Sequence, residues 1–113
     1  MRQHSRLTFR HVNRVQVTNR LSGDAVGYVA DLSLGGLRLI TSEPLVVGGC
    51  YELSLHVPTH NEKTREVEVV VLCQWCRKQT RRNGFEVGFA LDRPAPAFAA
   101  LVAEQAPRRR SVT

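Results

Sequence analysis

Apolar and polar residues alternate along most of this chain, which is the pattern of β-strands that keep one face against a core. The clearest case is the segment 51–57, where Leu53, Leu55 and Val57 share one face. The longest is the segment 65–77, whose middle is apolar on both faces, so we expect it to be covered on both sides. In all, the pattern predicts six strands, at 12–18, 25–31, 37–41, 51–57, 65–77 and 85–91.

The hydrophobic period changes near the C-terminus. Phe98, Leu101 and Val102 recur at the spacing i, i+3, i+4 in the alanine-rich segment 94–105, which predicts a short amphipathic helix. We expect this helix to plug one side of a curled sheet. Turn-forming residues separate the strands, at 19–24, 58–63 and 81–84. Six short strands followed by a helix predict an all-β fold, a small six-stranded antiparallel β-barrel with a short C-terminal helix.

The length of 113 residues suffices for one domain with one modest core. We expect a flexible N-terminal arm at 1–11, the barrel at 12–105 and a basic C-terminal tail at 106–113. No apolar run approaches the roughly 20 residues that cross a bilayer, and the first residues lack the apolar segment of a signal peptide. These features predict a cytoplasmic protein without membrane insertion.

Basic residues outnumber acidic ones, which gives a formal net charge of +6. A protein of this charge is expected to meet an anionic partner. Much of the charge lies near the two ends of the chain, at Arg2, Arg6, Arg10, Arg14, Arg20 and 108–110. No second motif elsewhere in the chain accompanies the arginines at 108–110, so we interpret them as a solvated tail.

A polar turn between two strand-like runs is the centre of the pattern. In the segment 31–36, alternation places Asp31 and Ser33 on one face and directs Leu32 and Leu34 toward the core. Asp, Ser and Gly are common turn residues, so this segment can be structural and nothing more. Alternatively, a carboxylate and a hydroxyl beside glycines can form one wall of a binding site.

A second group upstream favours the binding interpretation. Arg6 and Arg10 form an Arg-x-x-x-Arg motif, and twenty positions separate Arg10 from Asp31, which begins Asp-x-Ser-x-x-Gly. Together the two motifs resemble the PilZ domain, the small β-barrel receptor for the bacterial messenger cyclic di-GMP. The segments 36–39 and 84–89 also look like strands of that family, so the resemblance covers most of residues 6–103.

The resemblance implies that Arg6, Arg10, Asp31, Ser33 and Gly36 bind cyclic di-GMP. The chemistry of these side chains suits that ligand. Arginine bonds phosphate oxygens in pairs, stacks on bases and matches the O6/N7 edge of guanine. The other guanine edge presents N–H donors and needs an acceptor such as Asp31. Ser33 could donate to a ligand oxygen, and Gly36 would keep the surface clear of a Cβ.

Four further residues are candidate ligand contacts. Many relatives have adjacent arginines at the head of the first motif, whereas here Ser5 precedes Arg6, and Arg2 or Arg14 could compensate. Trp75, at a strand end, forms either part of the ligand rim or a cap on the barrel core. Arg38 is expected to point outward, where it lines the same surface or is simply solvated.

Cysteines and histidines give no sign of a metal centre or a catalytic site. Cys73 and Cys76 have the spacing of a zinc half-site, but no second pair completes it. In a strand their odd offset directs the two sulfur atoms to opposite faces, so we expect reduced, partly buried thiols here and at Cys50. No Ser/His/Asp arrangement has identifiable context, and the four histidines are most simply surface residues.

The sequence therefore predicts a non-enzymatic cyclic di-GMP receptor without cofactor or metal, which relays the signal to a protein partner. The family implies control of motility, biofilm formation or exopolysaccharide synthesis in a bacterial cytoplasm. One alternative is a PilZ-like interaction module that binds no nucleotide. Another is a small barrel that binds nucleic acid without sequence preference, which would require exposed aromatic residues among the basic ones.

Overall fold

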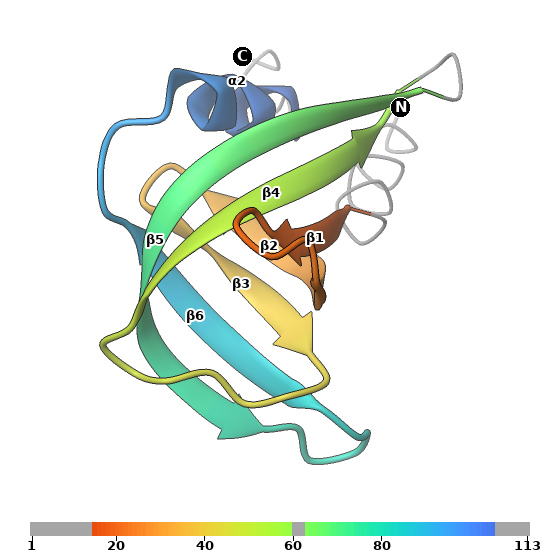
Figure 1. Cartoon of the computed structure of the whole chain (residues 1–113), viewed down its shortest axis with the longest axis vertical. Helices are drawn as coiled ribbons and strands as arrows, with labels where there is room; N and C mark the ends of the chain where they lie inside the picture. The colour runs from red at the N-terminus through yellow and green to blue at the C-terminus, as the bar shows by residue number, and fades with distance from the viewer. Residues whose placement is uncertain (1–14, 60–62, 106–113) are drawn as a thin grey trace, which may run out of the picture.

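A computed structural model of the chain describes residues 15–59 and 63–105. Six strands close into an antiparallel barrel in the order β1-β2-β3-β6-β5-β4, and one short helix follows them (Figure 1). This architecture confirms the predicted fold class. The elements are β1 (Gln16–Asn19), β2 (Ala25–Ser33), β3 (Gly36–Thr41), β4 (Cys50–Pro58), β5 (Thr64–Lys78), β6 (Phe85–Leu91) and α2 (Pro96–Gln105).

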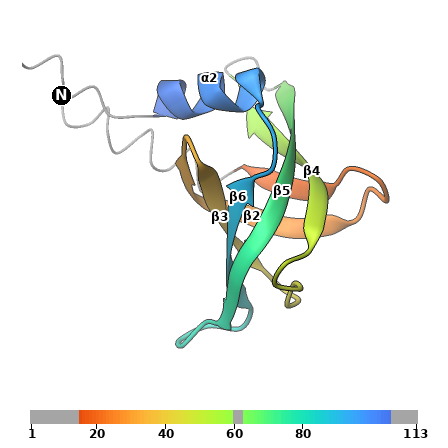
Figure 2. The same ribbon diagram turned by 90° about the vertical axis from the view of Figure 1, so that its left-hand side faces the viewer.

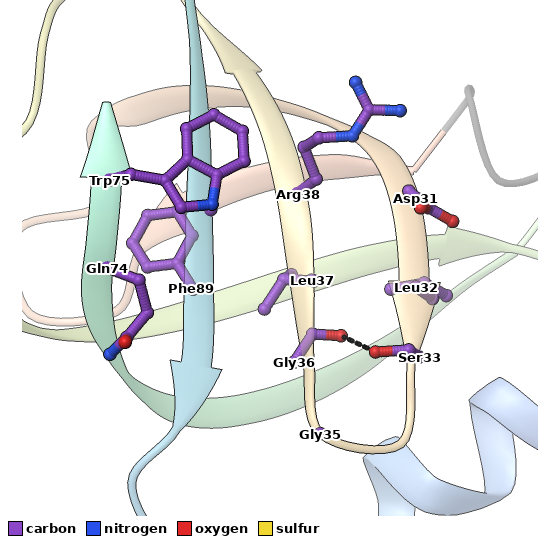
Figure 3. A pocket seen from close by; sticks show the side chains of 11 residues that line it. Asp31, Leu32, Ser33, Gly35, Gly36, Leu37, Arg38, Gln74, Trp75 and Phe89 are labelled. Carbon is purple, nitrogen blue, oxygen red and sulfur yellow. Dashed lines mark hydrogen bonds between the residues drawn. The ribbon is translucent and has the colours of Figure 1, made fainter. Parts of the chain in front are cut away.

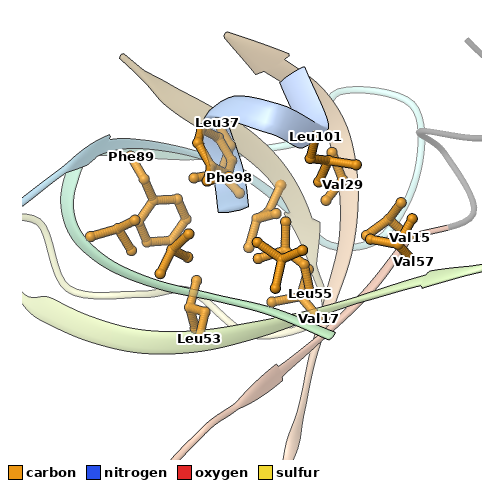
Figure 4. Packing of buried hydrophobic residues seen from close by; sticks show 14 of the residues in the cluster. Val15, Val17, Val29, Leu37, Leu53, Leu55, Val57, Phe89, Phe98 and Leu101 are labelled. Atoms are coloured by element: carbon orange, nitrogen blue, oxygen red, sulfur yellow. The ribbon is translucent and has the colours of Figure 1, made fainter. Parts of the chain in front are cut away.

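The core is a continuous set of valine and leucine side chains from all six strands (Figure 4). Alternation puts Leu53, Leu55 and Val57 of β4 inside, as predicted. On β5 the inward row is fully buried, whereas Val70 and Leu72 on the outer face are only half buried. The middle of β5 is therefore covered on both faces only in part.

Helix α2 lies across one end of the barrel in both views (Figures 1 and 2). Phe98 and Leu101 point from it into the core and are completely buried. Burying two such side chains contributes about 1.5–3 kcal/mol each, which holds the helix on the barrel. The prediction that the helix plugs one side of the sheet is confirmed. No helix among the described residues has the length and apolar character to cross a membrane.

Two β-bulges change which residues share a face. In β2 the bulge leaves Ala30 without a partner, because Val29 pairs with Leu39 and Asp31 with Arg38. The strand then continues to Ser33, and only two residues connect it to β3. Leu34 therefore lies in the turn and is 69% exposed, so the expectation that it faces the core is wrong. Leu32 does pack against the core.

The second bulge lies in β5 at Gln74, since Cys73 pairs with Phe89 and Trp75 with the next residue, Gly88. It overturns the expectation that Cys73 and Cys76 point to opposite faces. One extra residue turns their odd offset into an even one, and both thiols face the core. Cys73 is buried and Cys76 half buried, whereas Cys50 is exposed, so the expectation of partial burial is wrong for Cys50. All three are free cysteines, as predicted.

Candidate functional site

Four residues on neighbouring strands form one row across the outer wall of the barrel. Asp31 on β2 pairs with Arg38 on β3, Arg38 pairs with Gly88 on β6, and Gly88 pairs with Trp75 on β5. Residues in register on one face lie side by side, so the two bulges bring Asp31 and Trp75 onto the same wall. Figure 3 shows Trp75, Arg38 and Asp31 in this order.

This row lines an open pocket of about 370 Å³. Its floor is the wall of strands β2, β3, β6 and β5, and its lower rim is the β2–β3 turn (Figure 3). The pocket has an acid at one end and an aromatic ring at the other. The lining residues are Asp31, Leu32, Ser33, Gly35, Gly36, Leu37, Arg38, Gln74, Trp75, Gly88 and Phe89.

The indole of Trp75 lies directly over Gly88. A Cβ at Gly88 would collide with the ring at Nε1 and Cε2, so only glycine permits this close approach. Trp75 is 38% exposed and belongs to the pocket, and the interpretation of this residue as a cap on the barrel core is wrong. A partly exposed aromatic ring beside the pocket is a side chain that a flat ligand can contact.

A carboxylate holds two arginines beside this ring. Glu86 accepts hydrogen bonds from Nη1 of Arg38 at 3.1 Å and from Nε of Arg77 at 2.8 Å. The guanidinium of Arg77 lies 5.1 Å from the centre of the Trp75 ring, within range of a cation–π interaction. Arg38 points outward as predicted, but it is an ion-paired residue of the pocket wall.

Asp31 is an acidic residue of the pocket whose side chain has no bonding partner among the described residues. Its partner across the strands is Arg38, yet Arg38 pairs with Glu86 instead. Within residues 15–59 and 63–105, the Asp31 carboxylate has no ion-pair or hydrogen-bond partner of its own. It is exposed at the pocket's edge, so its oxygens can accept hydrogen bonds from a ligand.

Ser33 and Gly36 close the turn beneath the pocket. The Ser33 hydroxyl donates a hydrogen bond of 3.3 Å to the Gly36 carbonyl (Figure 3). A Cβ at Gly36 would collide with the backbone carbonyl of Phe89 on β6. The missing Cβ therefore lets β3 and β6 approach each other, and the expectation that it also keeps the surface clear for a ligand stays a prediction. In this conformation the Ser33 proton is also engaged within the turn.

The sequence matches one model of a known protein family. The model of the PilZ domain matches residues 1–104, nearly the whole length. The chain belongs to the PilZ family. This is a family of receptor domains for cyclic di-GMP, as the two motifs had indicated. Searches among curated proteins and among solved structures returned no match.

The PilZ match spans both motifs, but only the second motif, Asp-x-Ser-x-x-Gly, lies among the residues that the structure describes. Asp31, Ser33, Gly36, Arg38 and Trp75 are brought together at one pocket. The arginines of the N-terminal segment lie outside the described residues, and their contribution stays a prediction. They are Arg2, Arg6, Arg10 and Arg14.

Sequence reasoning missed three residues of this PilZ pocket and its surroundings. Gly88 carried a usable signal, because an isolated glycine inside a strand pattern often marks a close approach. Gln74 lines the pocket as the bulged residue, and a shift of one residue in the hydrophobic period does not by itself identify the position of a bulge. Glu86 meets Arg38 and Arg77 because β6 pairs with both β3 and β5. This arrangement of strands cannot be read from their order in the sequence.

Proposed function

We propose that this chain is a receptor for cyclic di-GMP that binds the dinucleotide in the pocket on the β2, β3, β6 and β5 wall. The observation that carries the proposal is the row from Asp31 to Trp75, an unengaged carboxylate and a stacking ring on one wall of a PilZ-family chain. Arg6 and Arg10, within the matched range, supply the cations for the phosphates.

Each side chain has a role suited to one part of the ligand. Asp31 accepts hydrogen bonds from the N–H groups on the Watson–Crick edge of a guanine. Trp75 offers its ring for stacking on a purine, and Arg38 adds positive charge to the wall behind it. Ser33 either accepts a hydrogen bond on its free lone pairs or turns its proton from Gly36 to a ligand oxygen.

The proposed receptor is non-enzymatic. One line of side chains on the barrel has the order of a nucleophile, a base and an acid. The Thr18 hydroxyl lies 2.8 Å from Nε2 of His56, and Nδ1 of His56 lies 3.6 Å from a Glu66 oxygen. These three residues sit on neighbouring strands and do not line the pocket proposed for the dinucleotide. We interpret them as a polar patch on the wall.

Ligand binding would hold the segment that carries Arg6 and Arg10 against the Asp31 face and so change the exposed surface. A protein partner in a bacterial cytoplasm would read that change, and the family's association with motility and biofilm control makes such a pathway the natural one. The partner's identity does not enter the mechanism, which needs only a surface that differs between the two states.

Calorimetry with cyclic di-GMP tests the proposal. Loss of one charge-assisted hydrogen bond costs roughly 1.5–3 kcal/mol, so Asp31→Ala and Arg10→Ala should each weaken binding about 10-fold or more. Asp24→Ala is the matched control, because Asp24 is an exposed acid in the β1–β2 turn and does not line the pocket. GTP and cyclic GMP serve as competitors of the same base chemistry.

The same experiment has outcomes that contradict the proposal. Equal affinity of the wild type, Asp31→Ala and Arg10→Ala would remove the site. Failure of the wild type to bind any of the three nucleotides would favour the interaction module without a nucleotide. Binding of single-stranded DNA in place of cyclic di-GMP, with a steep dependence on salt, would indicate the nucleic-acid alternative.

A further inference from the structure

The positive charge of the described barrel is concentrated in one place. Acidic and basic residues are equally numerous in residues 15–59 and 63–105, so this part of the protein is formally neutral. Four of its basic residues nevertheless lie within six positions, at the end of β5 and in the turn that follows. They are Arg77, Lys78, Arg81 and Arg82, and we call the segment 77–84 the basic hairpin.

Elsewhere on the barrel, each arginine has a carboxylate partner. Arg20 is paired with Glu52, Arg65 with Glu104 and Arg93 with Asp92. Arg38 shares the carboxylate of Glu86 with Arg77, the first residue of the hairpin. Within the described ranges, Lys78, Arg81 and Arg82 have no ion pair, and Lys63 in the β4–β5 connection is the only other basic residue of which this is true.

The basic hairpin surrounds a hollow of about 440 Å³. Its lining is cationic and rich in hydrogen-bond donors. The one acid in the lining is Glu86, which is paired with Arg38 of the first pocket. The lining residues are Arg77, Lys78, Gln79, Thr80, Arg81, Arg82 and Glu86. The hollow therefore places three exposed cations without a carboxylate partner around one concave surface. Basic side chains that only contact water would not require such a concave surface.

One backbone hydrogen bond and a contact with β3 support this hairpin. Gln79 donates a backbone hydrogen bond of 3.0 Å to Gly84, which has a φ of +102°. A Cβ at Gly84 would also lie 2.7 Å from the Thr41 carbonyl, so the hairpin rests against the end of β3. In both views it projects from the end of the barrel opposite α2 (Figures 1 and 2). It is a supported and accessible surface.

We propose that the basic hairpin is the docking surface for an acidic segment of a partner protein. Guanidinium groups bind carboxylates through paired hydrogen bonds, so Arg81 and Arg82 suit glutamate and aspartate side chains. Single-stranded nucleic acid would need aromatic side chains among the cations, and the hollow has none in its lining, because Trp75, the ring beside Arg77, belongs to the first pocket. The proposal goes beyond dinucleotide binding, because none of Lys78, Arg81 and Arg82 lines the first pocket.

Fluorescence anisotropy with a labelled peptide of alternating glutamate and serine, at physiological ionic strength, tests the docking surface. The full chain should bind the peptide, and Arg81→Glu/Arg82→Glu should weaken binding at least about 10-fold. Arg108→Glu/Arg109→Glu changes the net charge by the same amount and is the matched control, which should bind nearly as the wild type does. Both variants should keep the wild-type affinity for cyclic di-GMP, which separates this test from that of the first pocket.

Three results would overturn the proposal. One is the absence of peptide binding by the wild type. Another is an equal loss in the two variants, which would mean that net charge and not the hairpin attracts the peptide. The third is tighter, hairpin-dependent binding of a thymidine oligonucleotide than of the peptide. Thermal melting checks that each variant is folded, and Arg81→Gln/Arg82→Gln replaces the charge reversal if that variant is not.

Discussion

Trp75 owes its place on the pocket wall to the absence of a side chain at Gly88. The indole fills the space that any Cβ at position 88 would occupy. Arg77 lies beside the ring, and Glu86 holds Arg77 in turn. One glycine and one carboxylate thus fix an aromatic surface that is large, partly exposed and already in position before a ligand arrives. Fixing the ring in advance lowers the entropic cost of binding.

Gly88→Ala should displace this ring. The added methyl group collides with the indole, so we expect a loss of stability of about 1–3 kcal/mol and weaker binding of cyclic di-GMP. Trp75 is the only tryptophan, so a change in the emission spectrum reports its movement directly. Gly35→Ala is the control, because a Cβ there meets nothing within 4 Å although Gly35 lines the same pocket. An unchanged spectrum in Gly88→Ala would contradict this account.

At the scale of elements, the strands could be predicted and the bulges could not. Alternation in the segment 51–57 indicated β4 and its inward face, because a half-buried strand repeats every two residues. A bulge shifts that repeat by one residue, and the hydrophobic pattern around Ala30 and Gln74 does not identify where the shift occurs. The bulge in β5 directs Cys76 to the core and Trp75 to the pocket wall, so the face expected for Cys76 was wrong.

The candidate site was predictable where it is local in sequence. Asp31 and Ser33 lie within one hairpin, and alternation within residues 31–34 placed them on one face, although the bulge at Ala30 decides that this face is the outer one. The other side of the pocket comes from β5, which is distant in sequence and joins through β6. Strand order in a barrel is set by tertiary packing, so no local pattern could have placed Trp75 opposite Asp31.

Helix α2 is the element whose contribution can be measured most simply. Phe98 is completely buried where the helix meets the barrel, so Phe98→Ala should lower the free energy of unfolding by about 3–5 kcal/mol. Glu104→Ala, on the same helix, removes only the exposed ion pair with Arg65 and should cost at most about 1 kcal/mol. Chemical denaturation measures both. Equal losses in the two variants would mean that the helix is not anchored through Phe98.

At the scale of the whole molecule, a buried thiol links stability to pH. Burial raises the pKa of Cys73 above its ordinary value of 9.0, and the neighbouring Cys76 raises this pKa further. The folded state therefore favours the protonated thiol. This contribution is fully present below pH 9.0 and is lost as the pH rises from there through the folded-state pKa.

Thermal melting between neutral and alkaline pH checks this linkage. The wild type should lose stability above pH 9.0 more steeply than Cys73→Ala, which has no thiol to ionise when it unfolds. Cys50→Ala is the control, because Cys50 is exposed, and it should follow the wild type. Parallel curves for the wild type and Cys73→Ala would show that this thiol does not contribute.

The closed strand order has a consequence for any signal that this protein passes on. Every strand of the described barrel is bonded to two neighbours, and backbone groups are left unpaired chiefly where one strand runs past another, as at residues 64–69 of β5 on the side of β6. Most of the surface that a recognising molecule meets consists of side chains and turns, so its selectivity would depend largely on individual substitutions. Paralogues with the same fold could then bind different partner proteins through substitutions of a few exposed residues.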